Sequence, residues 1–185
     1  CKTYRKNFPQ DSHDPKSDIT KVDETSIPDF DVLLAGFPCQ AFSIAGKRGG
    51  FNDTRGMLFF DVARIIKAKQ PKAFLLENVK GLTNHKGGKT LEVIINTLKD
   101  DLGYTVFYKV LNAKDYGTPQ LRKRLFFVGI RKDIETPFVF PEPVPLKYTF
   151  SEIMGGKTER DYSFTIRIGG RHSGINNRFN WDAYM

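Results

Sequence analysis

The chain has 185 residues, and its 29 lysines and arginines against 21 aspartates and glutamates give a formal net charge of +8. This length fits one domain, and a composition of 39% hydrophobic and 27% charged residues excludes a chain too polar to bury a core. No apolar run approaches the ~20 residues of a membrane-spanning helix, and the opening residues contain no apolar signal-peptide core. The positive charge favours a polyanionic partner, although an ordinary solvated basic surface would give the same balance.

The cysteine content bounds the chemistry further. The two cysteines, Cys1 and Cys39, cannot build a disulfide framework and match no zinc-binding spacing. We therefore expect a reducing compartment, no metal site and no membrane association. Because residue 1 is not Met and residues 1–8 look like the end of a helix already under way, we expect the chain to be a fragment of a longer protein.

The first half of the chain alternates between predicted strands and helices. After a polar segment in which residues 18–20 form a possible strand end, residues 31–36 are an apolar run typical of a strand buried on both faces. Helical spacing of apolar residues predicts a helix over about 56–69, which is followed by a buried strand over 73–76. A second helix is expected to end before Gly103. This order predicts a parallel sheet covered by helices.

The second half follows a different pattern. Residues 104–111 and 124–130 are rich in β-formers with no helix between them, which predicts an antiparallel pair at the edge of the sheet. Four prolines beyond Thr136 indicate a linker, and residues 151–185 have only weak periodicity.

A thiol and a carboxylate follow the two predicted parallel strands. Ligands bind beyond the carboxyl ends of such strands, and Cys39 follows the first strand while Glu77 ends the second. The sequence therefore predicts a reacting pair at one edge of the sheet. The alternatives are a buried small hydrophobe for Cys39 and a helix-capping or salt-bridged acid for Glu77.

The connection over residues 41–55 is long for a compact α/β domain and is rich in glycine and basic residues. Since it begins directly after the thiol, it is predicted to close over a substrate, with Ser43, Lys47 and Arg48 near phosphates. The alternative is a surface loop without a ligand.

A basic run precedes the last predicted strand. In a strand-like register Gln120, Arg122 and Arg124 point the same way, and two guanidinium groups together can hold a phosphate or a carbonyl oxygen. The alternative is a solvated basic strand edge that discourages aggregation.

Three motifs, in this order and spacing, resemble the DNA (cytosine-5) methyltransferases of bacterial restriction–modification systems: GFPCQ at 36–40, ENV at 77–79 and QLRKR at 120–124. GMLFF at 56–60 and NAKDYG at 112–117 are also similar to that family, so the resemblance covers roughly residues 1–132.

The resemblance implies an α/β fold, a partial Rossmann-like S-adenosylmethionine-dependent methyltransferase sheet with an antiparallel edge hairpin. It divides the chain into a partial catalytic domain over 1–135, the proline-rich linker over 136–150 and the start of a target-recognition region over 151–185. The arginines and asparagines of that last region can read base edges in the major groove, although an irregular surface tail is an equal alternative.

The resemblance also implies a reaction, the transfer of a methyl group from S-adenosylmethionine to carbon 5 of a cytosine flipped out of duplex DNA. Cys39 would add to carbon 6 of the ring, and Glu77 would contact ring nitrogen 3 in a protonated form favoured by burial at an apolar strand end. Arg122 and Arg124 would contact the exocyclic oxygen.

The remaining site residues are implied in the same way. The cofactor would lie against Asp18 and Ile19 at its adenine and against Pro38 and Leu58, although Asp18 could equally be a plain turn residue. The candidate nucleic-acid contacts are Gln40, Ser43, Lys47, Arg48 and Gln120.

Two features of the family pattern are missing from these residues, namely the glycine-rich cofactor loop and the closing strand and helix. We therefore expect the 185-residue chain to lack turnover by itself. The alternatives for function are an RNA cytosine-5 methyltransferase, a catalytically silent nucleic-acid-binding module and, less favoured, a Cys–His hydrolase using His85. We expect a location in the bacterial cytoplasm, and nothing in the sequence indicates an oligomeric state.

Overall fold

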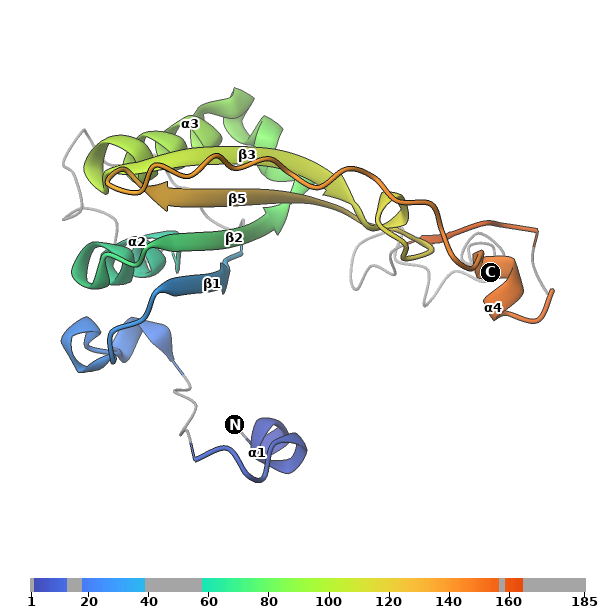
Figure 1. Cartoon of the computed structure of the whole chain (residues 1–185), viewed down its shortest axis with the longest axis horizontal. Coiled ribbons are helices and arrows are strands. Elements are labelled where there is room, and N and C mark those ends of the chain that lie inside the picture. Colours follow the sequence, from blue (N-terminus) through green and yellow to red (C-terminus); the bar gives the residue numbers. More distant parts are fainter. Residues whose placement is uncertain (1, 13–17, 39–57, 157–158, 165–185) are drawn as a thin grey trace.

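The fold is built on a mixed four-stranded sheet with the strand order β1-β2-β5-β3 (Figure 1). The computed structural model describes residues 2–12, 18–38, 58–156 and 159–164. The sheet strands are β1 (Val32–Gly36), β2 (Ala73–Val79), β3 (Tyr104–Asn112) and β5 (Lys123–Arg131). β1 and β2 are parallel, whereas β5 runs antiparallel to both β2 and β3. Both the predicted parallel pair and the predicted antiparallel edge pair are confirmed.

The helices between the strands begin and end close to where the sequence predicts. α2 spans Leu58–Lys69 and stops before Gln70-Pro71, where Gln70 has a positive φ of 45°. α3 spans Lys89–Asn96 and continues as a π-helical turn to Asp101. The chain then reverses at Gly103, whose φ of 80° is a conformation that favours glycine, and enters β3.

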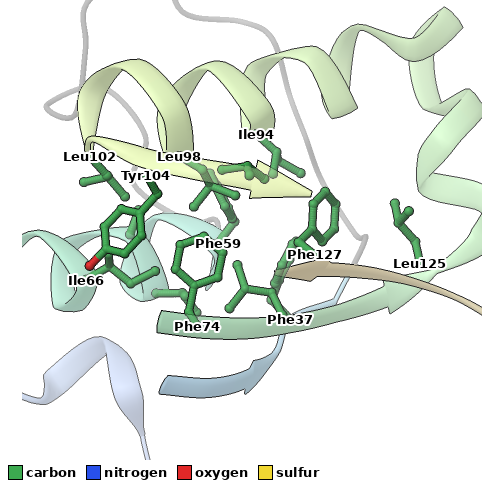
Figure 2. Close-up of a cluster of buried hydrophobic side chains, with 14 of the residues drawn as sticks. Phe37, Phe59, Ile66, Phe74, Ile94, Leu98, Leu102, Tyr104, Leu125 and Phe127 are labelled. Carbon is green, nitrogen blue, oxygen red and sulfur yellow. The ribbon is translucent and has the colours of Figure 1, made fainter. Parts of the chain in front are cut away.

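One hydrophobic core fills the space between the sheet and these two helices (Figure 2). Along β2, Phe74, Leu76 and Asn78 are buried and alternate with more exposed residues, as expected for a strand with one covered face. α2 and α3 therefore cover the same face of the sheet. The largest core side chains are Phe59, Ile66, Phe74, Ile94, Leu98, Tyr104, Leu125 and Phe127.

The opposite face of the sheet is only partly covered. The segment after β5 runs alongside β3 in Figure 1, and the ring of Phe138 packs 5.4 Å from that of Phe107. A groove of about 470 Å³ lies between this segment and the strands. Toward β1 the apolar face is open, because Leu34 is 71% exposed and Val32 is 55% exposed. The prediction that residues 31–36 form a strand buried on both faces is therefore wrong for the described structure, in which β1 ends the strand order of the sheet.

The remaining described elements are short. The α-helices are α1 (Lys2–Asn7) and α4 (Phe150–Ile153), and β4 (Gln120–Leu121) pairs in parallel with β6 (Ser163–Phe164). The 3₁₀ turns include η1 (Ile19–Lys21), η2 (Glu24–Ser26), η4 (Lys80–Gly88) and η6 (Ala113–Asp115).

The predicted strand end at residues 18–20 is wrong. Asp18 is instead the N-cap of η1, because its carboxylate accepts hydrogen bonds from the backbone and hydroxyl of Thr20. This local bonding competes with strand pairing and explains the turn.

Candidate active site

Glu77 lies near the carboxyl end of β2 on the face of the sheet opposite the core. It stands directly across from Gly36 of β1, the third residue before Cys39. A Cβ atom placed at Gly36 would lie 3.6 Å from Oε2 of Glu77, so the carboxylate rests against the strand at that glycine. The strand register therefore places Glu77 beside the carboxyl end of β1, as the sequence predicted.

Arg124 forms an ion pair with Glu77. Nε of Arg124 lies 2.8 Å from Oε1 of Glu77, and the two side chains are 20% and 38% exposed. Charge-assisted bonds of this length are among the stronger polar contacts in proteins. The expectation that Glu77 is buried at an apolar strand end is wrong, and the alternative of a salt-bridged acid describes its contact in the structure.

A pocket of about 360 Å³ opens beside this ion pair. Its volume is within the range of small-ligand sites. Glu77, Arg122 and Arg124 line it together, as the sequence predicted for the two arginines. The other lining residues are Leu111, Ala113, Tyr116, Thr118 and Phe126.

Gln120 does not share this placement. It lies in β4, opposite Ser163 of β6, and is not among the described residues that line the pocket. The single strand register assumed for Gln120, Arg122 and Arg124 is interrupted between β4 and β5. The interruption falls at Arg122, whose backbone N–H donates to the carbonyl of Gln120 at 2.9 Å.

Asn78 joins the ends of the two parallel strands, a role that the sequence analysis missed. Its side chain is 2% exposed, and its Nδ2 donates to the Phe37 carbonyl at 2.8 Å. Its Oδ1 accepts from the backbone N–H of Val79 at 2.8 Å. The signal was present in the sequence, since an amide at an inward-facing strand position needs a buried partner. This partner lies two residues before Cys39.

Several candidates fall on parts of the chain that the structure does not describe. Cys39, Gln40, Ser43, Lys47 and Arg48 all lie outside the described residues. Their roles stay predictions.

The candidate cofactor residues lie on the surface near α2. Ile19 and Leu58 are apolar side chains that are 38% and 36% exposed, and Pro38 is also exposed. Hydrogen bonds from Thr20 lower the pKa of Asp18. Asp18 therefore acts as a turn residue, which was one of its two predicted roles. The Oδ2 atom of Asp18 lies 3.5 Å from Nζ of Lys21.

Three further findings concern metal binding, His85 and membrane spanning. Within the described ranges, no three His, Cys, Asp or Glu side chains are grouped so that they could hold a metal ion. His85 contacts Thr90, with 2.7 Å between Nδ1 and Oγ1. In the same part of the chain, no helix has both the length and the apolar character needed to cross a bilayer.

Comparison with known proteins gives matches along nearly the whole chain. The sequence matches the family C-5 cytosine-specific DNA methylase over residues 1–182. The Type II methyltransferase M.NgoBI of Neisseria gonorrhoeae is 52% identical over 163 residues, which are 88% of this chain and 50% of that protein. M.HpaII of Haemophilus parainfluenzae is 56% identical over 162 residues, which are 85% of this chain and 44% of that protein. The chain thus spans about half the length of the curated relatives it matches.

Solved structures agree on the fold. A putative DNA modification methyltransferase encoded within an E. coli prophage superposes with a TM-score of 0.56 at 26% identity, covering 78% of this chain and 42% of that one. A variant of Spodoptera frugiperda DNMT2 superposes with a TM-score of 0.63 at 24% identity, covering 82% and 48%. Since the match to this family and the two Type II methyltransferases span most of the sequence, and the sheet has the fold of these methyltransferases, the chain belongs to the C-5 cytosine-specific DNA methylase family.

Proposed function

We propose that the protein transfers a methyl group from S-adenosylmethionine to carbon 5 of a cytosine flipped out of duplex DNA, as part of a restriction–modification system. Family membership and the relatives' name, Type II methyltransferase, support the reaction type and the substrate. The net charge of +8 supports a polyanionic partner. One structural observation carries the proposal: Glu77 and Arg124 form an ion pair at the wall of a pocket at the carboxyl end of β2.

The pocket is lined by both charged and apolar side chains, a combination that suits a flat polar ring. Glu77, Arg122 and Arg124 provide the charged groups, whereas Leu111 and Phe126 provide apolar surface. A pyrimidine has this same division, with ring nitrogen and exocyclic oxygen on one edge and two apolar faces. A base turned out of the duplex could enter the pocket, while a base inside the stack would not reach it.

Cys39 supplies the nucleophile in this mechanism. Carbon 5 of cytosine is too weakly nucleophilic to take a methyl group directly. The Cys39 thiolate adds its electron pair to carbon 6, and electrons move through the ring toward nitrogen 3 and the exocyclic oxygen. Asn78 supports this step by holding the carbonyl of Phe37, two residues before the thiol.

Glu77, Arg122 and Arg124 stabilise the negative charge that this addition creates on the ring. Glu77, after taking up a proton from solvent, delivers it to nitrogen 3, and the guanidinium groups of Arg122 and Arg124 donate hydrogen bonds to the exocyclic oxygen. Because Arg124 already contacts Oε1 of Glu77, a base that enters the pocket meets a donor and a carboxyl group held side by side. S-adenosylmethionine supplies an electrophilic methyl group on its sulfonium. Methyl transfer to carbon 5 would release the rest of the cofactor as a neutral thioether. Loss of the carbon-5 proton to a base, departure of the Cys39 thiolate and return of the nitrogen-3 proton to Glu77 then restore the ring.

The cofactor contacts proposed here are Asp18, Ile19, Pro38 and Leu58. The exposed apolar side chains of Ile19 and Leu58, together with the nearby carboxylate of Asp18, suit an adenine, which has apolar faces and an amino group. The two segments touch, because Nη2 of Arg64 in α2 donates to the Ile19 carbonyl at 2.6 Å. The apolar side chains of Ile19 and Leu58 and the acceptor carboxylate of Asp18 therefore fit the adenine of S-adenosylmethionine.

The proposed DNA contacts are Gln40, Ser43, Lys47, Arg48 and Gln120. We assign the catalytic part to residues 1–135 and the beginning of target recognition to residues 151–185, with the proline-rich linker between them. The pairing of Gln120 with Ser163 brings the basic motif next to the proposed recognition region, which supports this arrangement.

Transfer of tritiated methyl groups by the complete polypeptide that contains these 185 residues tests the proposal. Duplex DNA should be labelled at carbon 5 of cytosine, and Cys39→Ala should abolish the labelling. Labelling of transfer RNA alone would favour the RNA methyltransferase, and DNA binding without any labelling would favour the silent binding module. Hydrolysis of an acyl ester dependent on Cys39 would revive the hydrolase.

A further inference from the structure

Arg64 in the middle of α2 makes an unusual set of polar contacts with a distant part of the chain. Its Nε lies 3.0 Å from Oδ1 of Asp61 on the same helix. Nη1 donates to Oε2 of Glu24 at 2.5 Å and to the Val22 carbonyl at 2.8 Å. Nη2 donates to the Ile19 carbonyl at 2.6 Å. One guanidinium thus contacts the first residue of η1, the residue that follows η1 and the first residue of η2.

Among the described residues, the long-range hydrogen bonds that reach the segment over residues 18–26 come from Arg64. Neither η1 nor η2 contains a buried residue, and the hydrogen bonds that Thr20 and Thr25 donate to the carboxylates of Asp18 and Asp23 are local. The contacts of Arg64 with this segment cross 40 to 45 residues of sequence. They therefore fix the position of the segment on the helix, which local bonding cannot do.

The charge of Arg64 is compensated on both sides. Its side chain is only 24% exposed, and Asp61 orients it from within α2 while Glu24 meets it from the segment. Burial opposes the charged form, but the hydrogen bonds to Asp61 and Glu24 outweigh that effect and raise the pKa of Arg64. A lysine could not reproduce the arrangement, because a single ammonium lacks the planar fork that reaches several acceptors at once.

We propose that Arg64 is a positioning residue for the cofactor, which holds the segment from Asp18 to Glu24 on α2 and so fixes Asp18 and Ile19. The inference rests on the proposed cofactor contacts of those two residues. Arg64 acts through the segment and has no contact of its own with the reacting groups. Loss of this anchor should weaken cofactor binding more than it slows chemistry, because the loosened segment must be ordered each time the cofactor binds.

Arg64→Gln and Arg64→Lys test this role in the complete polypeptide, with Arg131→Gln as the matched control. Arg131 also joins a carboxylate and a backbone carbonyl, those of Asp133 and Gln70, and its side chain is 31% exposed. Its contacts do not involve the segment. Hydrogen exchange at the amides of Val22 and Ser26, KM for S-adenosylmethionine and kcat are measured for each variant.

We expect Arg64→Gln to speed amide exchange in the segment and to raise KM for S-adenosylmethionine at least about tenfold while kcat changes less than about threefold. Arg64→Lys should be intermediate, and Arg131→Gln should match the wild type in both readouts. Unchanged exchange, unchanged KM or a fall in kcat alone would overturn the proposal. If Arg64→Gln prevents folding, Glu24→Gln removes one contact only and should give a smaller rise in KM, and an unchanged KM would again overturn it.

The same experiment separates this inference from the proposed function. A wild-type protein that binds no S-adenosylmethionine would end the cofactor assignment and with it the positioning role. A wild-type protein that binds the cofactor with an affinity insensitive to Arg64 would end the positioning role alone.

Discussion

Arg124 Nε lies 2.8 Å from Glu77 Oε1, and both side chains line the same pocket at the end of the central strands. β2 and β5 place them in adjacent strands, with Arg124 across from Val79 and Glu77 across from Phe126. The ion pair is therefore set by the strand register and not by a flexible loop. In the proposed reaction this pair receives the polar edge of the cytosine.

Glu77→Gln should lower kcat for DNA methylation by about 10²–10⁴-fold, because an amide cannot deliver a proton to ring nitrogen 3. The half-exposed side chain makes a large loss of stability unexpected. Initial rates under saturating DNA give the comparison. Glu92→Gln on the exposed side of α3 is the control and should keep the wild-type rate. A Glu77→Gln enzyme with the wild-type rate would contradict the assigned role.

Asn78→Ala should destabilise the protein by about 1–3 kcal/mol, because it leaves the Phe37 carbonyl without its buried donor. It should also lower kcat, since the chain leading to Cys39 loses its anchor. Urea unfolding and initial rates measure the two effects. The exposed Asn96 gives a matched control, and Asn96→Ala should change neither quantity appreciably. Equal stability of the two variants would refute the anchoring role.

Gly129→Ala should destabilise the core by about 1–3 kcal/mol through overpacking. A Cβ atom at Gly129 would lie 2.1 Å from Cζ of Phe74, whose ring is 1% exposed and packs 5.0 Å from Tyr104. The ring is packed against Tyr104 in the core, so it must shift to make room for the added methyl group. Gly81→Ala is the control, because nothing lies within 4 Å of a Cβ there. Thermal unfolding compares the two, and the same melting temperature for both would show that the core accommodates the methyl group.

Stability should fall at high pH through Tyr104. Burial raises the pKa of Tyr104 to about 12, and its hydroxyl donates to the Pro71 carbonyl at 2.6 Å. A pKa raised in the folded state stabilises the protein fully below the unfolded value of about 10, and this contribution is lost as the pH rises through the folded value. Urea unfolding across this window should show a decline on the order of 2 kcal/mol.

Tyr104→Phe is the control for that decline. It should cost about 1 kcal/mol at neutral pH through the lost hydrogen bond and should remove this part of the alkaline decline. An identical decline in both proteins would assign the effect to other groups.

The sequence predicted the framework of the fold well because hydrophobic periodicity carries that information. The apolar run at 31–36 and the helical spacing after Leu58 correspond to β1 and α2, and the β-rich runs correspond to β3 and β5. The strand end predicted at residues 18–20 was wrong, because the Asp18 side chain accepts a bond from the backbone N–H of Thr20, and hydropathy does not report such local bonding.

The candidate site was predicted less completely. Strand order places Glu77 beside the end of β1, but its ion pair with Arg124 depends on the register between β2 and β5, which no single motif encodes. The role of Asn78 depends on a carbonyl in another strand, and the contacts of Arg64 cross 40 to 45 residues. Such long-range polar contacts become visible only when the chain is folded.

A covalent complex with duplex DNA containing 5-fluorocytosine tests the central claim most directly, because fluorine at carbon 5 blocks the loss that would release the enzyme. With S-adenosylmethionine present, peptide mass spectrometry of the complete polypeptide should locate the adduct on Cys39, and Cys39→Ser should abolish it. Cys1 gives an internal comparison for nonspecific thiol reactivity. An adduct on Cys1, or methylated product without any adduct on Cys39, would contradict the account.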